Sequence, residues 1–346
     1  VSVTRSADAL TVSAGELAWT VPTSGEYLVE RATRAGRVTM QHLRLAALRQ
    51  DGAEPEGAGS VRRELFTSKV TRVALEQEGP VRAVVKLDGV HAARAGKTRD
   101  WLPFSVRLYF YAGSDSVRIV HSFIYDGDPA RDFIAGLGVT ARVGMLDATH
   151  DRHVRFAGEG VGVWGEAVRP VTGLRRDPGQ EYKDAQVAGR ALPPLSGMAK
   201  PVQDGLRWIP EWGDFTLTHP TPDGFVLRKR ARSGHAWIDA NAGKRTKGLV
   251  YAGGASGGVA LGFKDFWQRA PSQLDVRKAA SDMADVTAWV WSPSSPAMDM
   301  RSYRSTDGMD TFEAQIAGLN ITYEDYEPGW DASPGVARTT ELQLWV

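Results

Sequence analysis

The sequence contains no cysteine, which excludes disulfides, thiolate nucleophiles and cysteine-based zinc sites. It also lacks a charged-then-apolar signal sequence and any apolar run near the roughly 18 residues that would span a bilayer. Net charge is nearly absent, because 42 Lys and Arg offset 41 Asp and Glu in 346 residues. No molecule-wide field therefore favours nucleic acid or an anionic membrane, and any selectivity for anions must be local.

Helix signals are scarce as well. They are short and confined to residues 129–134, 265–268 and 310–317, and the sequence has no internal repeat or low-complexity tract. Segments rich in β-branched and aromatic residues recur instead, and residues 104–125 predict one long hairpin that turns at 113–116. The sequence therefore predicts a mainly β fold, a large antiparallel β-sandwich with few short helices.

Two segments interrupt the strand pattern. Residues 50–60 are polar and glycine-rich and predict a linker or long loop, while residues 165–213 are rich in Pro, Gly and Arg and predict a long irregular binding loop. The GGASGG run at 253–258 joins two predicted strands with no helix after it, so it predicts a hairpin rather than a phosphate loop. His121 lies on an apolar strand face and is expected in the core.

The stretch from Arg228 to Trp267 gathers cationic side chains, a histidine and two tryptophans. Such a mixture suits an anionic sugar, because Arg and Lys hold carboxylates while indole faces stack on pyranose rings. Elsewhere the segment THDRH has a histidine spacing that could hold a metal ion, with Asp151 nearby, although the sequence offers no clear third ligand.

Several long segments resemble one known family. They are RLYFYAGSDSVRIVHSFIYDGDPARDFIAGLGV (107–139), RHVRFAG (152–158), GVWGEAVRPVTGLRRDPG (162–179), TPDGFVLRKR (221–230), KDFWQRAPSQLDV (264–276), VTAWVWSPSSPAMDMR (286–301) and GLNITYEDYEPGWDASPGVARTTEL (318–342). In this order they resemble the exo-rhamnogalacturonan lyases, a polysaccharide lyase group that includes YetA-like proteins. The resemblance covers residues 60–346.

The resemblance implies a larger, multidomain protein. Residues 1–55 are expected to be part of an N-terminal β-barrel-like domain, and residues 60–346 the β-sandwich. A C-terminal helical toroid is expected as a partner domain of the same native polypeptide, and this sequence does not contain it. The start at Val1 and the strand-like end at Val346 indicate a trimmed chain. We expect a secreted or periplasmic protein whose partner is an acidic polysaccharide, with no nucleic acid or membrane partner.

A lyase that eliminates at a uronate needs a cation beside the carboxylate, a base for the C5 proton and an acid for the leaving oxygen. We expect the catalytic groups to be His235, Arg230 and Tyr326. The expected substrate-binding residues are Arg169, Arg176, Lys229, Trp237, Lys264, Trp267 and Trp164.

Each candidate also has a plain structural interpretation. In this interpretation His235 is a turn histidine beside solvated charges, KDFW begins a short helix with Phe266 and Trp267 packed inward, and the acidic segment around Tyr326 is a turn. No resident cofactor is expected; calcium could replace an arginine, and Asp126-Gly-Asp128 is a candidate for it. Paired carboxylates leave glycoside hydrolysis open, and a non-catalytic carbohydrate-binding module is the third alternative.

Overall fold

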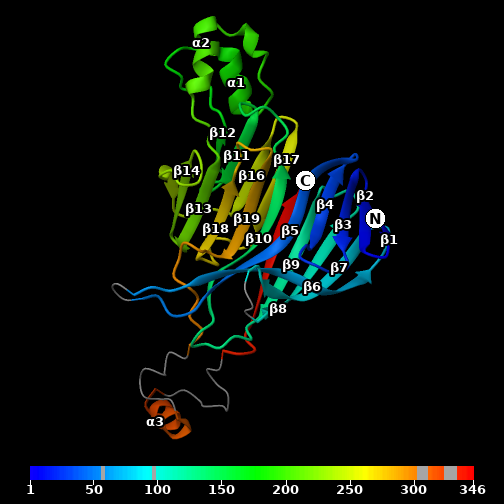
Figure 1. The fold of residues 1–346 in the computed structure, drawn as a ribbon, viewed down its shortest axis with the longest axis vertical. Helices are drawn as coiled ribbons and strands as arrows, with labels where there is room; N and C mark the ends of the chain where they lie inside the picture. Colours follow the sequence, from blue (N-terminus) through cyan, green and yellow to red (C-terminus); the bar gives the residue numbers. More distant parts are fainter. Residues whose placement is uncertain (56–58, 96–98, 302–310, 323–332) are drawn as a thin grey trace.

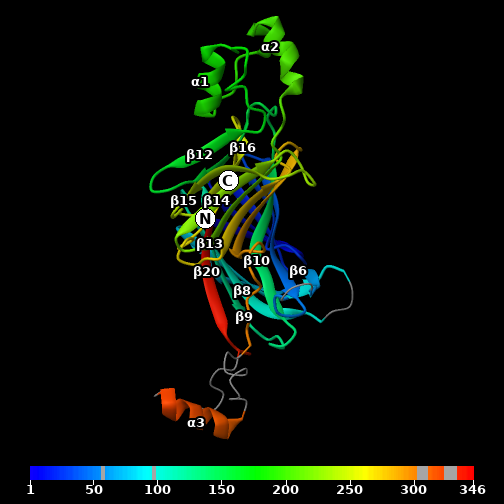
Figure 2. The same cartoon turned by 90° about the vertical axis from the view of Figure 1, so that its left-hand side faces the viewer.

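The computed structural model describes residues 1–55, 59–95, 99–301, 311–322 and 333–346. Its strands pair antiparallel throughout these residues, and two curved layers pack against each other with few helices (Figures 1 and 2). The predicted mainly β sandwich is therefore confirmed.

One layer contains both the first strands of the chain and strands from its second half. Its order is β15 (Ile238–Gly243), β14 (Gly224–Arg230), β13 (Asp214–Thr221), β18 (Ser272–Arg277), β19 (Met283–Trp291), β10 (Phe133–Gly144), β5 (Arg37–Gln50), β4 (Val29–Arg34), β3 (Leu17–Pro22), β2 (Ala9–Ala14) and β1 (Ser2–Arg5). The edge strand β15 and its neighbour β14 lie at one end of this layer.

The other layer runs β6 (Arg63–Gln77), β7 (Arg82–Ala93), β8 (Trp101–Tyr111), β9 (Ser116–Ile124), β20 (Ala337–Trp345), β17 (Gly257–Phe263), β16 (Leu249–Gly254), β11 (Arg152–Ala157) and β12 (Val163–Ala167). The end of β5 pairs with the start of β6 and so joins the layers. β12 is the edge strand here, and it lies at the same end of the sandwich as β14 (Figure 1).

The core lies between the layers because apolar residues alternate along the strands. In β2 and β3 every second residue is buried, and the fully buried Trp19 ring lies 5.7 Å from that of Phe110 in the facing layer. Such alternation is what an antiparallel sheet with one wet face requires. Burying one large apolar side chain stabilises the fold by about 1.5–3 kcal/mol, so this face specifies the strand register.

Several local predictions are confirmed and two are wrong. The hairpin at 104–125 is β8 and β9, GGASGG is the turn of β16 and β17, and His121 is 1% exposed. Residues 129–134 do not form a helix, because β10 begins at Phe133 and pairs with β5. Residues 265–268 form turns, since Asp265 has a left-handed φ of 59° that a helix cannot accommodate.

Short helices occupy the segment predicted to be an irregular loop. The segment contains α1 (Gln180–Ala188) and α2 (Lys200–Gly205), together with single 3-10 turns at Leu195–Gly197 and Leu206–Trp208. We call residues 169–212 the helical insert; it has a small core of its own, formed by Val171, Tyr182, Met198, Val202 and Leu206. It projects from the end of the sandwich that carries β11 and β12 (Figure 1). The predicted helix at 310–317 corresponds to α3 (Phe312–Thr322).

Residues 1–50 share one core with the rest of the chain. β5 pairs with both β6 and β10, and side chains from β2, β3 and β5 join the main hydrophobic cluster. The division into a partial barrel domain and a sandwich stays a prediction, as do the helical toroid and the secreted or periplasmic location. Within the described residues, no helix is both long and apolar enough to cross a membrane.

Candidate functional site

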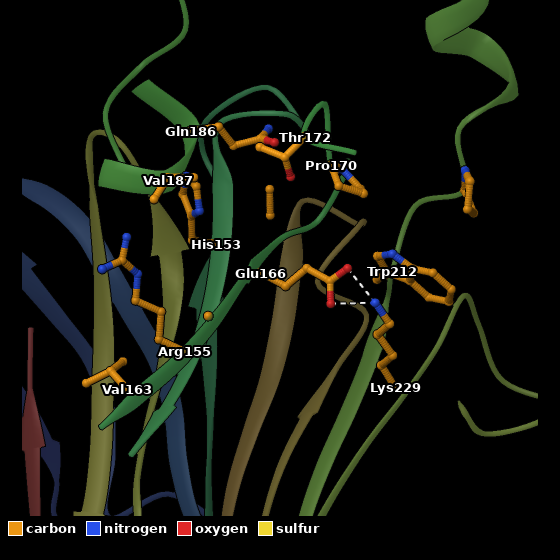
Figure 3. Close-up of a pocket in the computed structure, with 13 residues that line it drawn as sticks. His153, Arg155, Val163, Glu166, Pro170, Thr172, Gln186, Val187, Trp212 and Lys229 are labelled. Carbon is orange, nitrogen blue, oxygen red and sulfur yellow. Dashed lines mark hydrogen bonds and ion pairs between the residues drawn. The ribbon is translucent and has the colours of Figure 1, made fainter. Parts of the chain in front are cut away.

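A cleft of about 600 Å³ lies where the two layers end, at edge strand β12 and strand β14 (Figure 3). Its walls come from β11, β12, β14, helix α1 and both ends of the helical insert. The lining residues are His153, Arg155, Val163, Gly165, Glu166, Ala167, Pro170, Thr172, Gln186, Val187, Pro210, Trp212 and Lys229. We call this the edge cleft.

An ion pair crosses the edge cleft from one layer to the other. Lys229 Nζ on β14 donates to both carboxylate oxygens of Glu166 on β12 at 2.5 Å, and it lies 4.2 Å from the centre of the Trp212 ring (Figure 3). Lys229 is paired directly with Phe215, and Glu166 with Val154, whose side chains are both in the core. Both charged side chains therefore point between the layers, where screening by water is weak.

Arg155 lies on the face of β11 opposite to that of Val154. Gly165 and Gly189 leave it room: a Cβ on Gly165 would lie 3.2 Å from Arg155 Cγ, and one on Gly189 would collide with the guanidinium. Within the described parts of the chain, no carboxylate lies within 4 Å of this guanidinium. Arg155 is thus a cation in the cleft wall without an ion-pair partner from those residues.

His153 lines the cleft two residues before Arg155. It is 4% exposed, and its Nε2 has no hydrogen-bond partner within the described ranges. Burial lowers the pKa of His153 below its usual value, and the neighbouring Arg155 cation lowers it further. Burial and the Arg155 cation therefore both favour the neutral imidazole.

Two of the predicted substrate-binding residues form ion pairs with carboxylates of the chain itself. Arg169 forms an ion pair with Glu211, whose Oε1 also accepts a hydrogen bond from Thr149 at 2.8 Å. Lys229 lines the edge cleft, where Glu166 forms an ion pair with it. This pair joins the stretch from Arg228 to Trp267 to the segment predicted to be a binding loop, residues 165–213.

Arg230 and His235 do not form a common site with Lys229. Arg230 follows Lys229 on β14, so its side chain lies on the opposite face of the strand. It donates to Asp214 at 2.8 Å, and its guanidinium lies 4.3 Å from the centre of the Trp237 ring. His235 is exposed in the turn between β14 and β15, where its Nε2 accepts a hydrogen bond from Arg232 at 2.9 Å. The placement agrees with a turn histidine beside exposed charges, not with a buried base.

The remaining candidates are scattered. Lys264 is exposed and lines a separate hollow with Leu342. The Trp267 ring has the Arg245 guanidinium 4.3 Å from its centre. Phe266 is buried, as the structural interpretation of KDFW requires. Trp164 packs on core residues, with its ring 6.0 Å from that of Phe215, and does not line the cleft. Arg176 is in the helical insert. Tyr326 falls outside the described residues.

The metal candidates are engaged elsewhere. Asp126 Oδ1 accepts the Leu102 N–H at 2.7 Å, Asp128 Oδ1 accepts the Ala130 N–H at 2.9 Å, and Asp151 Oδ1 accepts the Leu192 N–H at 2.8 Å. Over the ranges that the structure describes, no group of three or more His, Cys, Asp or Glu side chains could hold a metal ion. A role for calcium therefore stays a prediction.

The sequence model for the central β-sandwich domain of PcRGLX-like proteins matches residues 1–346. The chain belongs to the PcRGLX-like family. This PcRGLX-like chain is also 30% identical over 351 residues to the uncharacterized protein YetA of Bacillus subtilis strain 168. The alignment covers 99% of this chain and 39% of YetA, so the chain spans well under half the length of that relative.

Solved structures similar to this PcRGLX-like chain are more distant. A putative aldose 1-epimerase of Escherichia coli K12 has a TM-score of 0.37 at 11% identity, with 100% of each chain covered. The galactosidase domain of the α-galactosidase-sucrose kinase AgaSK has a TM-score of 0.45 at 8% identity, covering 99% of this chain and 41% of the other. Similarities this low carry no argument about chemistry.

Proposed function

We propose that this PcRGLX-like sandwich is part of a polysaccharide lyase that cleaves a glycan containing uronate and rhamnose by β-elimination, with rhamnogalacturonan as the first candidate. Family membership supports the class of glycan. The observation that carries the choice of site is Arg155, a guanidinium in a cleft wall with no carboxylate beside it among the described residues. The proposed secreted or periplasmic location suits a polymer outside the cytoplasm.

The edge cleft offers two of the groups that elimination requires. Arg155 can form a bidentate pair with the uronate carboxylate, and neutralising that charge makes the C5 proton more acidic. His153, kept neutral by burial, is the proposed base for that proton. Trp212 lines the same cleft, where the Lys229 ammonium lies over its ring.

The same cleft does not favour hydrolysis by two carboxylates. Glu166 is the single carboxylate among the described residues that line it, and Lys229 donates to both of its oxygens. Glycosidases of that kind need a second carboxyl group on the other side of the scissile bond. We therefore place lyase chemistry before hydrolysis.

The decisive experiment compares this chain with the longer native polypeptide. Each is incubated with rhamnogalacturonan, ulvan or glucuronan, with and without EDTA, while the absorbance of the unsaturated uronate product is followed. Product formation supports a lyase, and its loss in EDTA would indicate a metal requirement. Reducing sugar released without this absorbance would contradict the proposal in favour of a hydrolase, and binding without turnover by either polypeptide would favour a carbohydrate-binding module.

Variants of the cleft then test the assignment of residues. Arg155→Ala should lower kcat/KM at least a hundredfold, and Arg155→Lys should restore only part of this loss because an ammonium lacks the planar fork. Arg72→Ala, an exposed arginine on β6, is the matched control and should leave turnover unchanged. Turnover unaffected in Arg155→Ala would show that the active site lies elsewhere.

A further inference from the structure

The helical insert carries an exposed aromatic ring beside a second hollow. Trp208 is 77% exposed, and the Arg207 guanidinium lies 4.9 Å from the centre of its ring. The hollow measures about 440 Å³, and its walls come from residues 174–176 and 201–209. The ring is therefore accessible to a ligand that enters the hollow, and an indole offers a large apolar face for such a contact.

Three arginines line this hollow, and none has a carboxylate within 4 Å among the residues that the structure describes. They are Arg175, Arg176 and Arg207, and Arg176 makes only a weak hydrogen bond to the Pro201 carbonyl oxygen at 3.4 Å. The acidic residues close by are already paired, since Asp177 holds Lys183 at 2.9 Å and Asp204 forms an ion pair with Lys200. The hollow is therefore locally cationic in a protein whose net charge is only +1.

The surface is built on a fixed framework. Tyr182 and Val202 are buried in the insert's own small core, and the Tyr182 hydroxyl donates to the Pro194 carbonyl oxygen at 2.8 Å. Gln186 is 4% exposed; its amide donates to the carbonyl oxygens of His150 and Arg169 and accepts the Val171 N–H. These hydrogen bonds attach α1 to the end of the sandwich, so the backbone framework of the insert is formed before a ligand arrives.

Both hollows are bordered by the same two chain segments. Thr172 and Pro210 line the edge cleft, while Leu174 and Ile209 line the hollow at Trp208. A chain molecule that occupies one hollow can therefore continue toward the other along these segments.

We propose that the hollow at Trp208 is a second binding subsite for an anionic sugar unit of the same polysaccharide. The indole stacks on the apolar face of a pyranose ring, and the arginines hold its carboxylate. The identity of the glycan rests on the proposed function, but the subsite itself depends only on binding. The subsite would bind the polymer at a distance from the sugar unit that reacts. Its loss would therefore weaken the binding of long substrates more than that of short ones.

Binding can be measured by affinity electrophoresis and calorimetry with sodium polygalacturonate, with neutral galactan as the comparison. Trp208→Ala should weaken binding of polygalacturonate at least tenfold, and Arg175→Ala with Arg176→Ala should weaken it and reduce its salt dependence. Val81→Ala, an equally exposed apolar residue far from the insert in sequence, should change nothing. Equal binding of galactan, or unchanged binding in Trp208→Ala, would overturn the proposal.

Turnover separates this inference from the proposed function. With short oligosaccharides Trp208→Ala should keep the rate of the unaltered protein, whereas with the polymer KM should rise and kcat should stay the same. If no glycan gives an unsaturated product while Trp208→Ala still weakens binding, the subsite holds and the lyase proposal fails. If Arg155→Ala abolishes turnover and Trp208→Ala leaves polymer binding intact, the lyase proposal holds and the subsite fails.

Discussion

At the scale of single residues, ion pairing decides which cations can meet a ligand. Arg230 is held by Asp214, Lys229 by Glu166 and Arg169 by Glu211. Breaking such a pair leaves a poorly hydrated carboxylate without its partner. Binding a substrate through one of these cations would therefore cost free energy.

Arg230 and His235 should respond differently to truncation. Asp214 is 4% exposed and also accepts the Lys278 N–H at 3.1 Å, so Arg230→Ala would leave a buried carboxylate half-satisfied and should lower the free energy of unfolding by about 2–4 kcal/mol. His235→Ala should change it by less than about 0.5 kcal/mol, because the side chain is exposed. Urea denaturation measures both, and equal stabilities would contradict the role given to the Asp214 pair.

Two buried histidines should make the fold sensitive to acid. Burial lowers the pKa of His91 to about 4; burial and, to a smaller degree, His91 lower the pKa of His121 to about 3. Both imidazoles stay neutral in the folded state at pH 5, whereas the unfolded chain takes up protons below its pKa of about 6.5. Stability should therefore be complete above about pH 6.5 and fall as the pH drops, by about 2 kcal/mol per histidine between pH 7 and pH 5.

Unfolding free energies measured from pH 7 to pH 5 test this dependence. His121→Met should flatten the slope, and Val81→Ala should leave it unchanged because valine carries no titratable group. Identical slopes in the two variants would show that the buried histidines are not responsible.

The candidate site could be predicted from the sequence only in part, because sequence proximity does not show which face a strand residue occupies. Lys229 and Arg230 are neighbours, yet one points between the layers and the other pairs with Asp214. Arg155 was missed although RHVRFA alternates polar and apolar residues, a pattern that puts His153 and Arg155 on one face. Its significance depends on Gly165 and Gly189, and their proximity follows only from the fold.

At the scale of elements, strands were easier to predict than helices. The β8–β9 hairpin follows from alternation with a short turn, because every second residue along most of both strands enters a core. The segment Gln180–Ala188 has few apolar residues and faces a small separate core, so its sequence has no strong helical period. Tertiary contacts, above all those of Gln186, decide that it is a docked helix.

Replacing Gln186 should release the insert without unfolding the sandwich. Gln186→Leu removes hydrogen bonds to Val171, His150 and Arg169 and leaves buried backbone groups unpaired, so amide exchange in residues 171–209 should speed up at least tenfold. Exchange in β10 and β19 should stay unchanged, and so should the melting temperature of the main transition. Hydrogen-exchange mass spectrometry distinguishes this from global destabilisation, in which all segments would accelerate together.

At the scale of the whole molecule, the second layer depends on one late strand. β20 lies between β9 and β17 and pairs with both, and its Glu341 forms an ion pair with Arg118, 223 positions earlier in the chain. No direct pairing of β9 with β17 is present in the described residues. The strand therefore links the two parts of this layer.

Removing residues 337–346 should abolish soluble folding. The deletion would expose the backbone edges of β9 and β17 in the middle of a layer, and such open edges promote aggregation. A synthetic peptide of residues 337–346 added during refolding should restore soluble protein, whereas a scrambled peptide should not. Size-exclusion chromatography reports the outcome, and a soluble monomer without any peptide would show that the layer closes by another route.

The position of β20 has a consequence for how the chain is made. A ribosome delivers β9 and β17 long before residues 337–345, so a nascent chain must hold two incomplete half-sheets until β20 emerges. Pairing over such long sequence separations is slow. A pause in translation before residue 337 would thus prolong this incomplete state. During that time, nascent chains on neighbouring ribosomes of one messenger RNA could pair their strands with each other.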